Sequence, residues 1–301
     1  MTWEAEGVLA LDLVHPEGKP LPGWAPGAHL DVHVGGRVRQ YSLCGDPHDT
    51  GGYRVAVLDE PASRGGSRYV HTTLRPGQTV HVTGPRNHFA LEDADSYVFL
   101  AGGIGITPIL AMAREAARTG KPYSLVHGGR SRASMAFGAE LTALQGGSVQ
   151  LWPQDEHGHI DLAAALAGLS PGTLVYCCGP EPLLTAVAEL CPAAQLRIER
   201  FTAPTTPAPD GTDTAFEVEC RTSGVRVTVD AGTSVLDAVA DAGVSVPSSC
   251  REGICGTCET RVLAGTPDHR DFLLSDAEQE AGDTMMICVS RCAAGPLVLD
   301  L

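Results

Sequence analysis

The stretch Cys250-Arg251-Glu252-Gly253-Ile254-Cys255-Gly256-Thr257-Cys258 places three thiols in one short glycine-rich segment, and Cys288 adds a fourth further along the chain. This spacing, Cys-x4-Cys-x2-Cys followed by a distant cysteine, is the ligand pattern of a plant-type [2Fe-2S] cluster. Glycines at 253 and 256 let the backbone wrap closely around such a cluster. We therefore predict Cys250, Cys255, Cys258 and Cys288 as the cluster ligands.

A structural zinc site and a disulfide cluster are the alternative interpretations of these cysteines. Zinc sites are usually built from two short Cys-x2–4-Cys pairs, whereas here three thiols share one segment and the fourth stands alone. Residues 1–30 contain no signal peptide. We therefore expect a reducing compartment, the cytoplasm, in which disulfides are rare.

The composition is that of a soluble globular protein. The chain has 301 residues, 43% of them hydrophobic and 19% charged, which is enough for two or three domains with ordinary cores. No run of eighteen apolar residues is present, so we expect no membrane span. The formal net charge of −15 disfavours nucleic acid and anionic membranes and favours partners with basic surfaces.

Residues 1–95 are predicted to form a small antiparallel β-barrel, because short strands alternate with glycine and proline turns. The expected strands are 7–13, 29–34, 37–43, 53–58 and 79–83. Two motifs in this segment suit a phosphate: Arg39-Gln40-Tyr41-Ser42-Leu43, and Arg64-Gly65-Gly66-Ser67 before a short helix at 69–74. An arginine, a hydroxyl group and free N–H groups at a helix start favour an anion. Alone, the first motif also fits an ordinary amphipathic strand.

Residues 96–201 are predicted to form a parallel, doubly wound α/β sheet, because strands here alternate with helices. Strand 97–101 precedes the loop Gly102-Gly103-Ile104-Gly105-Ile106-Thr107-Pro108 and a helix at 109–118. We expect Thr107 as the N-cap of this helix and Pro108 as its first residue. The remaining expected elements are 124–127, 135–144, 148–152, 161–166, 173–178, 181–190 and 196–201.

Two loops of this sheet are candidates for nucleotide binding, since ligands bind beyond the carboxyl ends of parallel strands. The first loop reads Gly-x-Gly-x-x-Pro rather than the dinucleotide fingerprint Gly-x-Gly-x-x-Gly. Its glycines, Gly102, Gly103 and Gly105, would still let a pyrophosphate approach backbone N–H groups. The second loop, Cys178-Gly179-Pro180, can equally be a tight turn between strand and helix.

Residues 202–214 contain three prolines and no large apolar residue, which predicts an extended linker. Residues 215–301 are predicted to form a compact α+β unit. Its expected elements are a hairpin at 216–221 and 225–230, a helix that starts with a capping box of Ser234 and Asp237, the cluster loop, and strands at 260–263 and 297–301.

Taken together, these motifs resemble the phthalate dioxygenase reductase family, which is related to vanillate demethylase reductases and to the reductase portion of self-sufficient P450 enzymes. The resemblance covers essentially the whole chain. It implies a multidomain protein with a flavin-binding β-barrel, a central nicotinamide-nucleotide domain and a C-terminal ferredoxin of the β-grasp fold.

The resemblance also implies roles for individual residues. It places Tyr41 on one face of the flavin, Phe201 on the other, Ser42 near flavin N5 and Cys178 near the nicotinamide. The alternatives are core aromatics and a buried thiol. Segments 84–89, 199–201 and 268–271 also match family segments. The residues expected to bind the flavin or the nucleotide are Arg39, Tyr41, Ser42, Leu43, Arg64, Gly65, Gly66, Ser67, Gly102, Gly103, Gly105, Thr107, Pro108, Arg130, Ser131, Arg132, Cys178, Gly179, Pro180 and Phe201.

The implied flavin is FMN, whereas related reductases with the same barrel use FAD; no further aromatic-rich loop suggests an adenine site. A flavin suits this chain because nicotinamide nucleotides give electrons in pairs and a [2Fe-2S] cluster takes them singly. The turn Arg130-Ser131-Arg132 suits a 2′-phosphate, yet similar turns occur in family members that look NADH-dependent. The choice between NADH and NADPH therefore stays open.

The leading functional interpretation is an NAD(P)H-dependent iron–sulfur flavoprotein reductase, expected as a monomer. It would pass electrons to a separate or formerly fused terminal oxygenase, either a Rieske-type oxygenase or a P450. The alternative is a redox-sensing or binding module with a vestigial flavin site. A flavin reductase or haemoglobin-linked enzyme is disfavoured by the cluster motif and the lack of a globin. A further interpretation is that the chain is a piece excised from a larger fusion.

Overall fold

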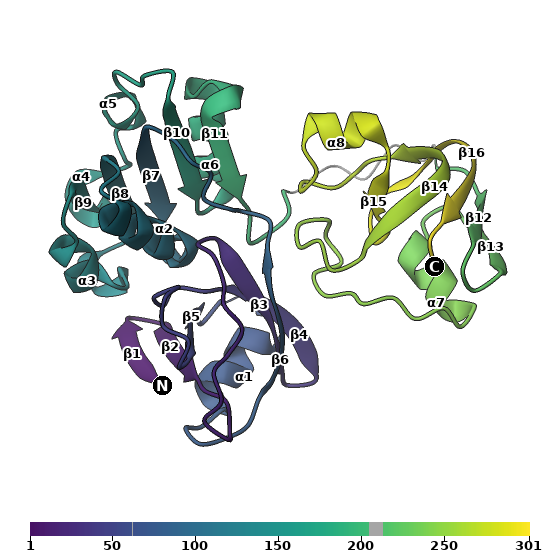
Figure 1. Ribbon diagram of the computed structural model, residues 1–301, viewed down its shortest axis with the longest axis horizontal. Helices are drawn as coiled ribbons and strands as arrows, with labels where there is room; N and C mark the ends of the chain where they lie inside the picture. Colours follow the sequence, from purple (N-terminus) through teal and green to yellow (C-terminus); the bar gives the residue numbers. More distant parts are fainter. Residues whose placement is uncertain (62, 205–212) are drawn as a thin grey trace. The chain divides into compact units, whose positions relative to one another are not determined.

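The computed structural model describes residues 1–61, 63–204 and 213–301. The chain divides into two compact units, Met1–Phe201 and Thr202–Leu301, which are drawn together in Figure 1. Most of the predicted linker, at 205–212, lies outside the described residues.

Unit 1 begins with two three-stranded antiparallel sheets in the region predicted as a barrel. Their strands, in spatial order, are β1 (Thr2–Ala5), β2 (Val8–Leu13) and β5 (Tyr53–Leu58) in one sheet, and β4 (Arg37–Ser42), β3 (Ala28–Val34) and β6 (His81–Asn87) in the other. A bridge between Leu43 and Val55 joins the two sheets. Apolar residues of both sheets, including Leu11, Leu30 and Val55, pack with helix α1 (Gly66–Thr72) in one core.

The second half of unit 1 is a five-stranded parallel sheet, as predicted. The strand order is β11-β10-β7-β8-β9. The elements are β7 (Ser96–Gly102), α2 (Ile106–Thr119), β8 (Tyr123–Gly129), α3 (Gly138–Ala143), β9 (Gly147–Pro153), α4 (Gln154–His157), α5 (Leu162–Ala165), β10 (Thr173–Cys178), α6 (Glu181–Leu190) and β11 (Leu196–Glu199), with short 3₁₀ turns η1 (Gly103–Gly105), η2 (Arg132–Ser134) and η3 (Ala193–Gln195).

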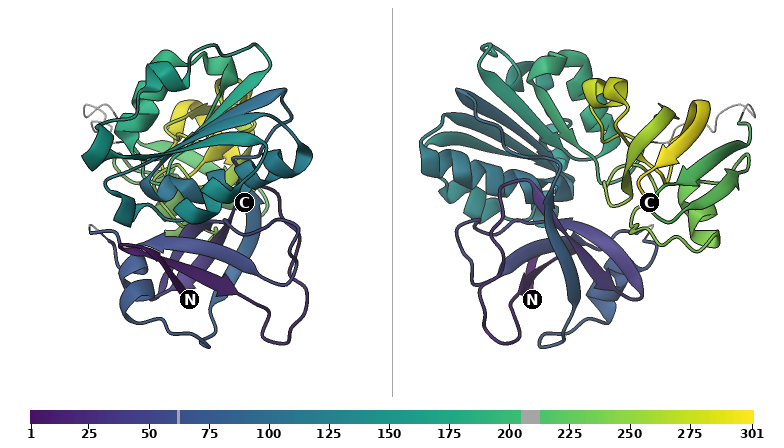
Figure 2. Two further views of the ribbon diagram at one scale, coloured as in Figure 1. Left: turned by 90° about the vertical axis from the view of Figure 1, so that its left-hand side faces the viewer. Right: turned by 45° about the vertical axis from the view of Figure 1, so that its right-hand side comes forward.

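Alternation of side chains along the strands builds a core on each face of this sheet. Phe99 of β7 packs on the face covered by α2 and α3. Its neighbour Leu100 packs on the opposite face with Leu184 and Val187 of α6. Figure 2 shows the parallel strands above the antiparallel sheets of the same unit.

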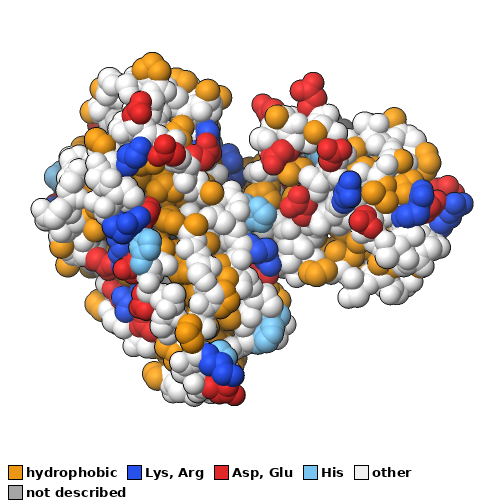
Figure 3. All heavy atoms as spheres, in the orientation of Figure 1, with side chains coloured by type: hydrophobic (Ala, Val, Ile, Leu, Met, Phe, Trp, Pro, Cys, Tyr) orange, Lys and Arg blue, Asp and Glu red, His pale blue; other side chains and the backbone are white. Residues whose placement is uncertain are grey.

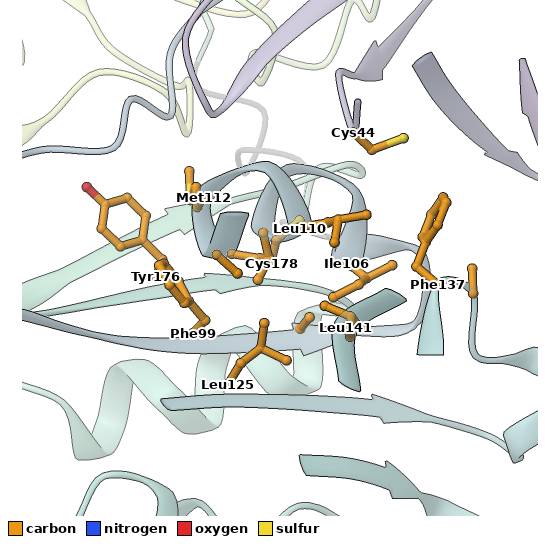
Figure 4. Packing of buried hydrophobic residues seen from close by; sticks show 14 of the residues in the cluster. Cys44, Phe99, Ile106, Leu110, Met112, Leu125, Phe137, Leu141, Tyr176 and Cys178 are labelled. Carbon is orange, nitrogen blue, oxygen red and sulfur yellow. The ribbon is translucent and has the colours of Figure 1, made fainter. Parts of the chain in front are cut away.

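The antiparallel and parallel parts of unit 1 share one hydrophobic core. Cys44, which follows β4, packs with Ile106 and Leu110 of α2 in a single cluster (Figure 4). The side chain of Arg114 on α2 adds a polar link, because it donates to the carbonyl oxygens of Cys44 at 2.5 Å and Gly45 at 2.6 Å. The predicted boundary at 95/96 therefore separates two sheets that pack against each other.

Three local expectations are wrong. Helix α2 begins at Ile106 with Gly105 as its N-cap, so Thr107 is not the cap. The chain enters this helix through η1, and the buried Thr107 hydroxyl donates instead to the carbonyl oxygen of Ile104 at 3.0 Å. The predicted helix at 135–144 is shortened to α3, which starts only after Phe137 in the left-handed region at φ 61°. The predicted helix at 69–74 begins earlier, at Gly66.

Unit 2 is the expected α+β fold. Its sheet has the order β13-β12-β16-β14-β15, with β12 and β16 parallel and the other pairs antiparallel. The elements are β12 (Phe216–Cys220), β13 (Val225–Val229), α7 (Val235–Asp241), β14 (Glu259–Asp268), α8 (Asp276–Ala281), β15 (Thr284–Met286) and β16 (Arg291–Leu299). Ser234 caps α7 by accepting from the N–H of Asp237, but the predicted capping box is incomplete, because the Asp237 carboxyl accepts from the Ser234 hydroxyl. Helix α8 and strand β15 were not anticipated.

In the described part of the chain, no helix has the length and apolar character needed to cross a lipid bilayer.

The shared core of unit 1 generates a stability prediction. Leu110 is fully buried in it, so Leu110→Ala should lower the free energy of unfolding by about 2–5 kcal/mol. All three tryptophans lie in unit 1, and their fluorescence during urea denaturation would report the loss. Leu190→Ala is the control, because Leu190 is 55% exposed and should change the value by less than about 0.5 kcal/mol. Equal effects of the two substitutions would contradict this assignment of the core.

Candidate functional site

The candidate site of unit 1 lies where the strand order of the parallel sheet reverses. β7 lies between β8 and β10, and Ala101 and Cys178 are register partners at the carboxyl ends of β7 and β10. The chain leaves β7 toward β8 and leaves β10 toward β11, on opposite sides. Such a switch point is where open α/β sheets bind ligands, and both predicted nucleotide loops start there.

Most glycines of these loops are explained by direct contact between the loops. A Cβ on Gly105 would lie 2.2 Å from the carbonyl oxygen of Cys178, and one on Gly102 would lie 2.6 Å from Cδ of Pro180. A Cβ on Gly179 would in turn lie 3.0 Å from Cα of Gly102. Gly103 differs, because it has a φ of +56° and no atom within 4 Å of its ideal Cβ position. It is therefore the loop glycine best suited to the predicted approach of a pyrophosphate.

Three side chains from distant parts of the sequence meet beside this switch point. The Ser42 hydroxyl donates to Oε2 of Glu199 at 3.5 Å, and the Cys178 thiol approaches the same oxygen at 3.9 Å. Burial raises the pKa of Glu199 to about 8, against the smaller opposing effect of the two hydrogen bonds. Burial, followed by the nearby Glu199, raises the pKa of Cys178 well above its ordinary value. The group can therefore hold a proton on Glu199 at neutral pH.

Sequence reasoning missed Glu199 as a functional residue. Within the segment 199–201, only Phe201 is predicted to contact a ligand. The available signal is an acidic residue at the carboxyl end of strand β11, on the ligand-binding edge of the sheet. Its partners, Ser42 and Cys178, lie 157 and 21 residues away along the chain, so their convergence depends on the tertiary fold.

The two predicted flavin-stacking aromatics have different surroundings. Tyr41 is partly buried against the core of the antiparallel sheets, and this burial raises its pKa to about 12, with Arg39 opposing the rise. Phe201 follows β11 and is 42% exposed. Neither arrangement excludes the predicted role, which stays a prediction. Leu43 is fully buried, and its N–H donates to the carbonyl oxygen of Ala28 at 2.8 Å. Neither its side chain nor its N–H is therefore exposed to a ligand in this structure.

The predicted phosphate site is assembled at the start of α1. A Cβ on Gly66 would lie 2.7 Å from Cγ of Arg39, so the glycine allows this arginine to lie against the helix start. Gly65 precedes the helix in the left-handed region at φ 103°. Ser67 donates to the hydroxyl of Ser63 at 2.8 Å, and Arg64 is exposed. An arginine packed over a glycine at a helix start is an arrangement suited to a flavin phosphate.

Two further predicted nucleotide contacts follow the first loop directly, and three others lie after β8. Pro108 is buried in the first turn of α2, as is Thr107. Arg130, Ser131 and Arg132 form the turn after β8, at the same edge of the sheet. The structure therefore brings the loops at Gly102 and Cys178 together and places the basic turn one strand away.

The cluster loop of unit 2 gathers the four predicted ligands. Interaction with Cys250 raises the pKa of Cys255, and interaction with Cys288 lowers the pKa of Cys258. Cys288 also interacts with Cys250, so each of the four thiols has at least two of the others as neighbours. The loop winds through three left-handed positions, at Arg251, Gly253 and Gly256, with φ values of 60°, 71° and 71°. The N–H of Glu252 donates to Sγ of Cys250 at 3.3 Å. Thiolates that ligate an iron–sulfur cluster accept hydrogen bonds of this kind.

The two alternative interpretations of the cysteines gain no support. All ten cysteines are free thiols. Across residues 1–61, 63–204 and 213–301, no three or more His, Cys, Asp or Glu side chains are placed to hold a single metal ion. Three thiols in one loop and a fourth from a separate segment suit a two-iron cluster better than one zinc ion.

The segment 268–271 and the Phe272 that follows it contact the cluster loop at Gly253. A Cβ on Gly253 would lie 3.0 Å from Cα of Asp271, and the N–H of Phe272 donates to the carbonyl oxygen of Gly253 at 3.0 Å. The buried carboxylate of Asp271 accepts from the N–H groups of Leu273 and Leu274 at 3.1 and 2.8 Å. This segment therefore fixes the middle of the loop.

Two protein-family models match parts of the chain. Residues 218–293 match the 2Fe-2S iron-sulfur cluster binding domain. Residues 99–189 match the oxidoreductase NAD-binding domain. The chain is 44% identical over 307 residues to phenoxybenzoate dioxygenase subunit beta of Ectopseudomonas oleovorans, with 100% of this chain and 95% of that protein covered.

Two solved structures are similar over essentially the whole chain. An intact type IV self-sufficient cytochrome P450 monooxygenase matches with a TM-score of 0.94 and 46% identity, over 100% of this chain and 40% of that chain. Phthalate dioxygenase reductase, described as a modular structure for electron transfer from pyridine nucleotides to [2Fe-2S], matches with a TM-score of 0.70 and 37% identity, over 99% of this chain and 95% of that chain. The predicted multidomain fold is confirmed.

The raised pKa of Glu199 predicts a pH dependence of stability. The pKa is about 8 in the folded chain, against an ordinary value of 4.5, so between these values the folded state holds a proton that the unfolded state has released. The free energy of unfolding should fall as pH rises from about 5 to 8. Glu199→Gln should remove this part of the slope.

Urea denaturation followed by tryptophan fluorescence across this pH range would measure the slope. Glu189→Gln is the control, since it removes an exposed carboxylate of the same unit. A slope that is the same in wild type and Glu199→Gln would show that Glu199 is ionised in the folded chain.

Proposed function

The chain belongs to the phthalate dioxygenase reductase family, and on that premise we propose that it carries electrons from NAD(P)H through FMN to a [2Fe-2S] cluster and on to a terminal oxygenase. It is an oxidoreductase with an NAD-binding domain and a 2Fe-2S domain. We retain 1–95 as the flavin-binding part, 96–201 as the nucleotide-binding part, 202–214 as the linker and 215–301 as the ferredoxin domain.

The convergence of Ser42, Cys178 and Glu199 is the observation that carries this proposal for unit 1. Ser42 belongs to the antiparallel sheets, whereas Cys178 and Glu199 end strands of the parallel sheet. A cofactor that takes electrons from a nucleotide has to contact both parts, and these three side chains mark the place where the parts meet. We propose that they line the reaction site.

The residues of unit 1 divide between holding and orienting the ligands. Arg39, packed over Gly66, would bind the flavin phosphate together with Gly65, Ser67 and the exposed Arg64. A bound flavin supplies the ability to accept electrons in pairs and release them one at a time. Glu199 would retain a proton beside Ser42 and Cys178. All three side chains would then be uncharged hydrogen-bond donors, which can stabilise the charge that develops on the flavin during electron transfer. Tyr41 and Phe201 would exclude water from the two faces of the ring.

The cluster would be held in unit 2 by Cys250, Cys255, Cys258 and Cys288. The left-handed backbone at Arg251, Gly253 and Gly256 turns the loop around these thiols, and the N–H of Phe272 holds it by donating to the carbonyl oxygen of Gly253. Thiolate ligation would give the potential typical of plant-type sites, roughly −400 mV.

The partner we propose is a terminal oxygenase, either a Rieske-type oxygenase or a P450. Relatives over the full length are named as subunits of dioxygenase systems. The matching P450 protein carries this region within one longer chain. The excess of 36 acidic over 21 basic residues favours a basic docking surface on the partner. We further propose a cytoplasmic location, because ten free thiols suit a reducing compartment.

An anaerobic visible spectrum of the purified chain tests the electron path. Stoichiometric NADH or NADPH should bleach flavin bands and then the iron–sulfur envelope, and the flavin released by acid should be FMN. Cys255→Ser should lose the cluster absorption but keep a flavin that the nucleotide reduces. Its rate of cytochrome c reduction should fall at least about tenfold below that of wild type.

Cys292→Ser is the matched control, because Cys292 lies in the same unit and is not a predicted ligand. It should retain both chromophores and the wild-type rate. Unchanged cytochrome c reduction by Cys255→Ser would contradict the order of the path, and a wild-type spectrum that neither nucleotide alters would contradict the proposed function.

The phosphate site at the start of α1 gives a separate prediction. Arg39→Ala removes a charge-assisted contact worth about 1.5–3 kcal/mol, so flavin should dissociate about 10–100 times more readily. Fluorescence of the released flavin during dilution would measure this. Arg54→Ala serves as the control, since Arg54 is a strand arginine paired with Asp12. Equal flavin retention by both variants would show that the phosphate binds elsewhere.

A further inference from the structure

The basic turn after β8 lies beside the acidic helix α4. β8 and β9 are adjacent parallel strands, and Gly129 and Pro153, at their carboxyl ends, are register partners. The turn Arg130-Ser131-Arg132 follows β8, and α4 follows β9 directly (Figure 1). Both segments therefore occupy the edge of the sheet at which a nucleotide is expected.

Arg132, one of the two arginines predicted to bind a 2′-phosphate, already has a carboxylate partner. Nε and Nη2 of Arg132 donate to Oε1 and Oε2 of Glu156 at 2.7 and 2.8 Å, in a bidentate pair. The hydrogen bond from Arg132 lowers the pKa of Glu156, so this carboxyl is ionised at neutral pH. Acidic and basic side chains also lie next to one another elsewhere on unit 1, as Figure 3 shows.

The backbone holds the helix and the turn together. The N–H of Asp155 donates to the carbonyl oxygen of Arg130 at 3.1 Å. Ser131 is also engaged, because it forms a capping box with Ser134 in which each side chain accepts from the other residue's backbone N–H. Two of the three groups predicted to bind a 2′-phosphate, Ser131 and Arg132, thus have partners within the fold.

The charges of this edge cancel. The turn contributes Arg130 and Arg132, while the first turn of α4 contributes Asp155 and Glu156. A 2′-phosphate is a phosphate monoester with about −1.5 to −2 charges at neutral pH, and it would approach a carboxylate as well as the two arginines. Sites for NADP present an arginine to this phosphate, whereas sites for NAD place an acidic residue near the ribose hydroxyl.

We propose that Glu156 makes this site select NADH over NADPH. Glu156 neutralises Arg132 and places a negative charge where the 2′-phosphate of NADPH would lie. The inference rests on the proposed function and deepens it by naming the nucleotide and the residue that discriminates. The pair is 57% exposed at Arg132 and 41% at Glu156, so its own contribution to stability is small and its loss should not unfold the chain.

The test compares kcat/KM for NADH and NADPH, with ferricyanide as acceptor at constant ionic strength. Wild type should favour NADH. Glu156→Gln keeps the shape of the side chain, removes the charge and releases Arg132. It should raise kcat/KM for NADPH about tenfold relative to that for NADH, mainly through KM. Adding Arg132→Gln should abolish this gain.

The matched control is Glu92→Gln, which breaks another bidentate pair of unit 1, with Arg197, and should leave the ratio unchanged. Calorimetry with 2′,5′-ADP and 5′-AMP gives a second readout, because it requires no electron transfer. Glu156→Gln should tighten 2′,5′-ADP binding about tenfold with little change for 5′-AMP.

A wild-type preference for NADPH would overturn the inference. So would a nucleotide ratio in Glu156→Gln equal to that of Glu92→Gln. If neither nucleotide reduces ferricyanide, the proposed function fails, whereas the calorimetric comparison still decides the role of Glu156.

Discussion

The contact between two backbone loops is the constraint on which the candidate site of unit 1 depends. Gly105 and Cys178 approach so closely that a single added Cβ would lie 2.2 Å from a carbonyl oxygen. Because this contact locks the ends of β7 and β10 together, Cys178 takes a fixed position beside Glu199 of the next strand. The core that the antiparallel and parallel sheets share then holds Ser42 beside Cys178 and Glu199. Close packing here requires glycine whether or not a ligand is bound.

The parts of the fold that sequence predicts well are those specified by local patterns. β10 and α6 have the predicted bounds, 173–178 and 181–190, because a buried apolar strand, a Gly-Pro turn and an amphipathic helix follow one another without ambiguity. The cluster ligands are equally local, since three of the four lie within one loop. Thr107 shows the limit of such patterns. A hydroxyl before proline is a good N-cap by composition, but the 3₁₀ turn η1 brings Gly105 to that position.

Glu199 shows why the chemistry of the site is harder to predict than its location. The resemblance and the loop pattern point to this edge of the sheet, and they single out Ser42 and Cys178 as candidates. No pattern reveals that a carboxyl group lies between them, because its partners come from two other strands. Its raised pKa is likewise a property of burial in the assembled unit, which is absent from any short stretch of sequence.

The same reasoning applies to charge. Arg130-Ser131-Arg132 is a basic turn in the sequence, yet in the fold Arg132 is paired with Glu156 and Ser131 with Ser134. The acidic residues belong to a different strand connection and are brought to the turn by the parallel register of β8 and β9. The net charge at this edge is therefore set by the packing of two connections, because the turn alone is positive, the first turn of α4 alone is negative, and together they cancel.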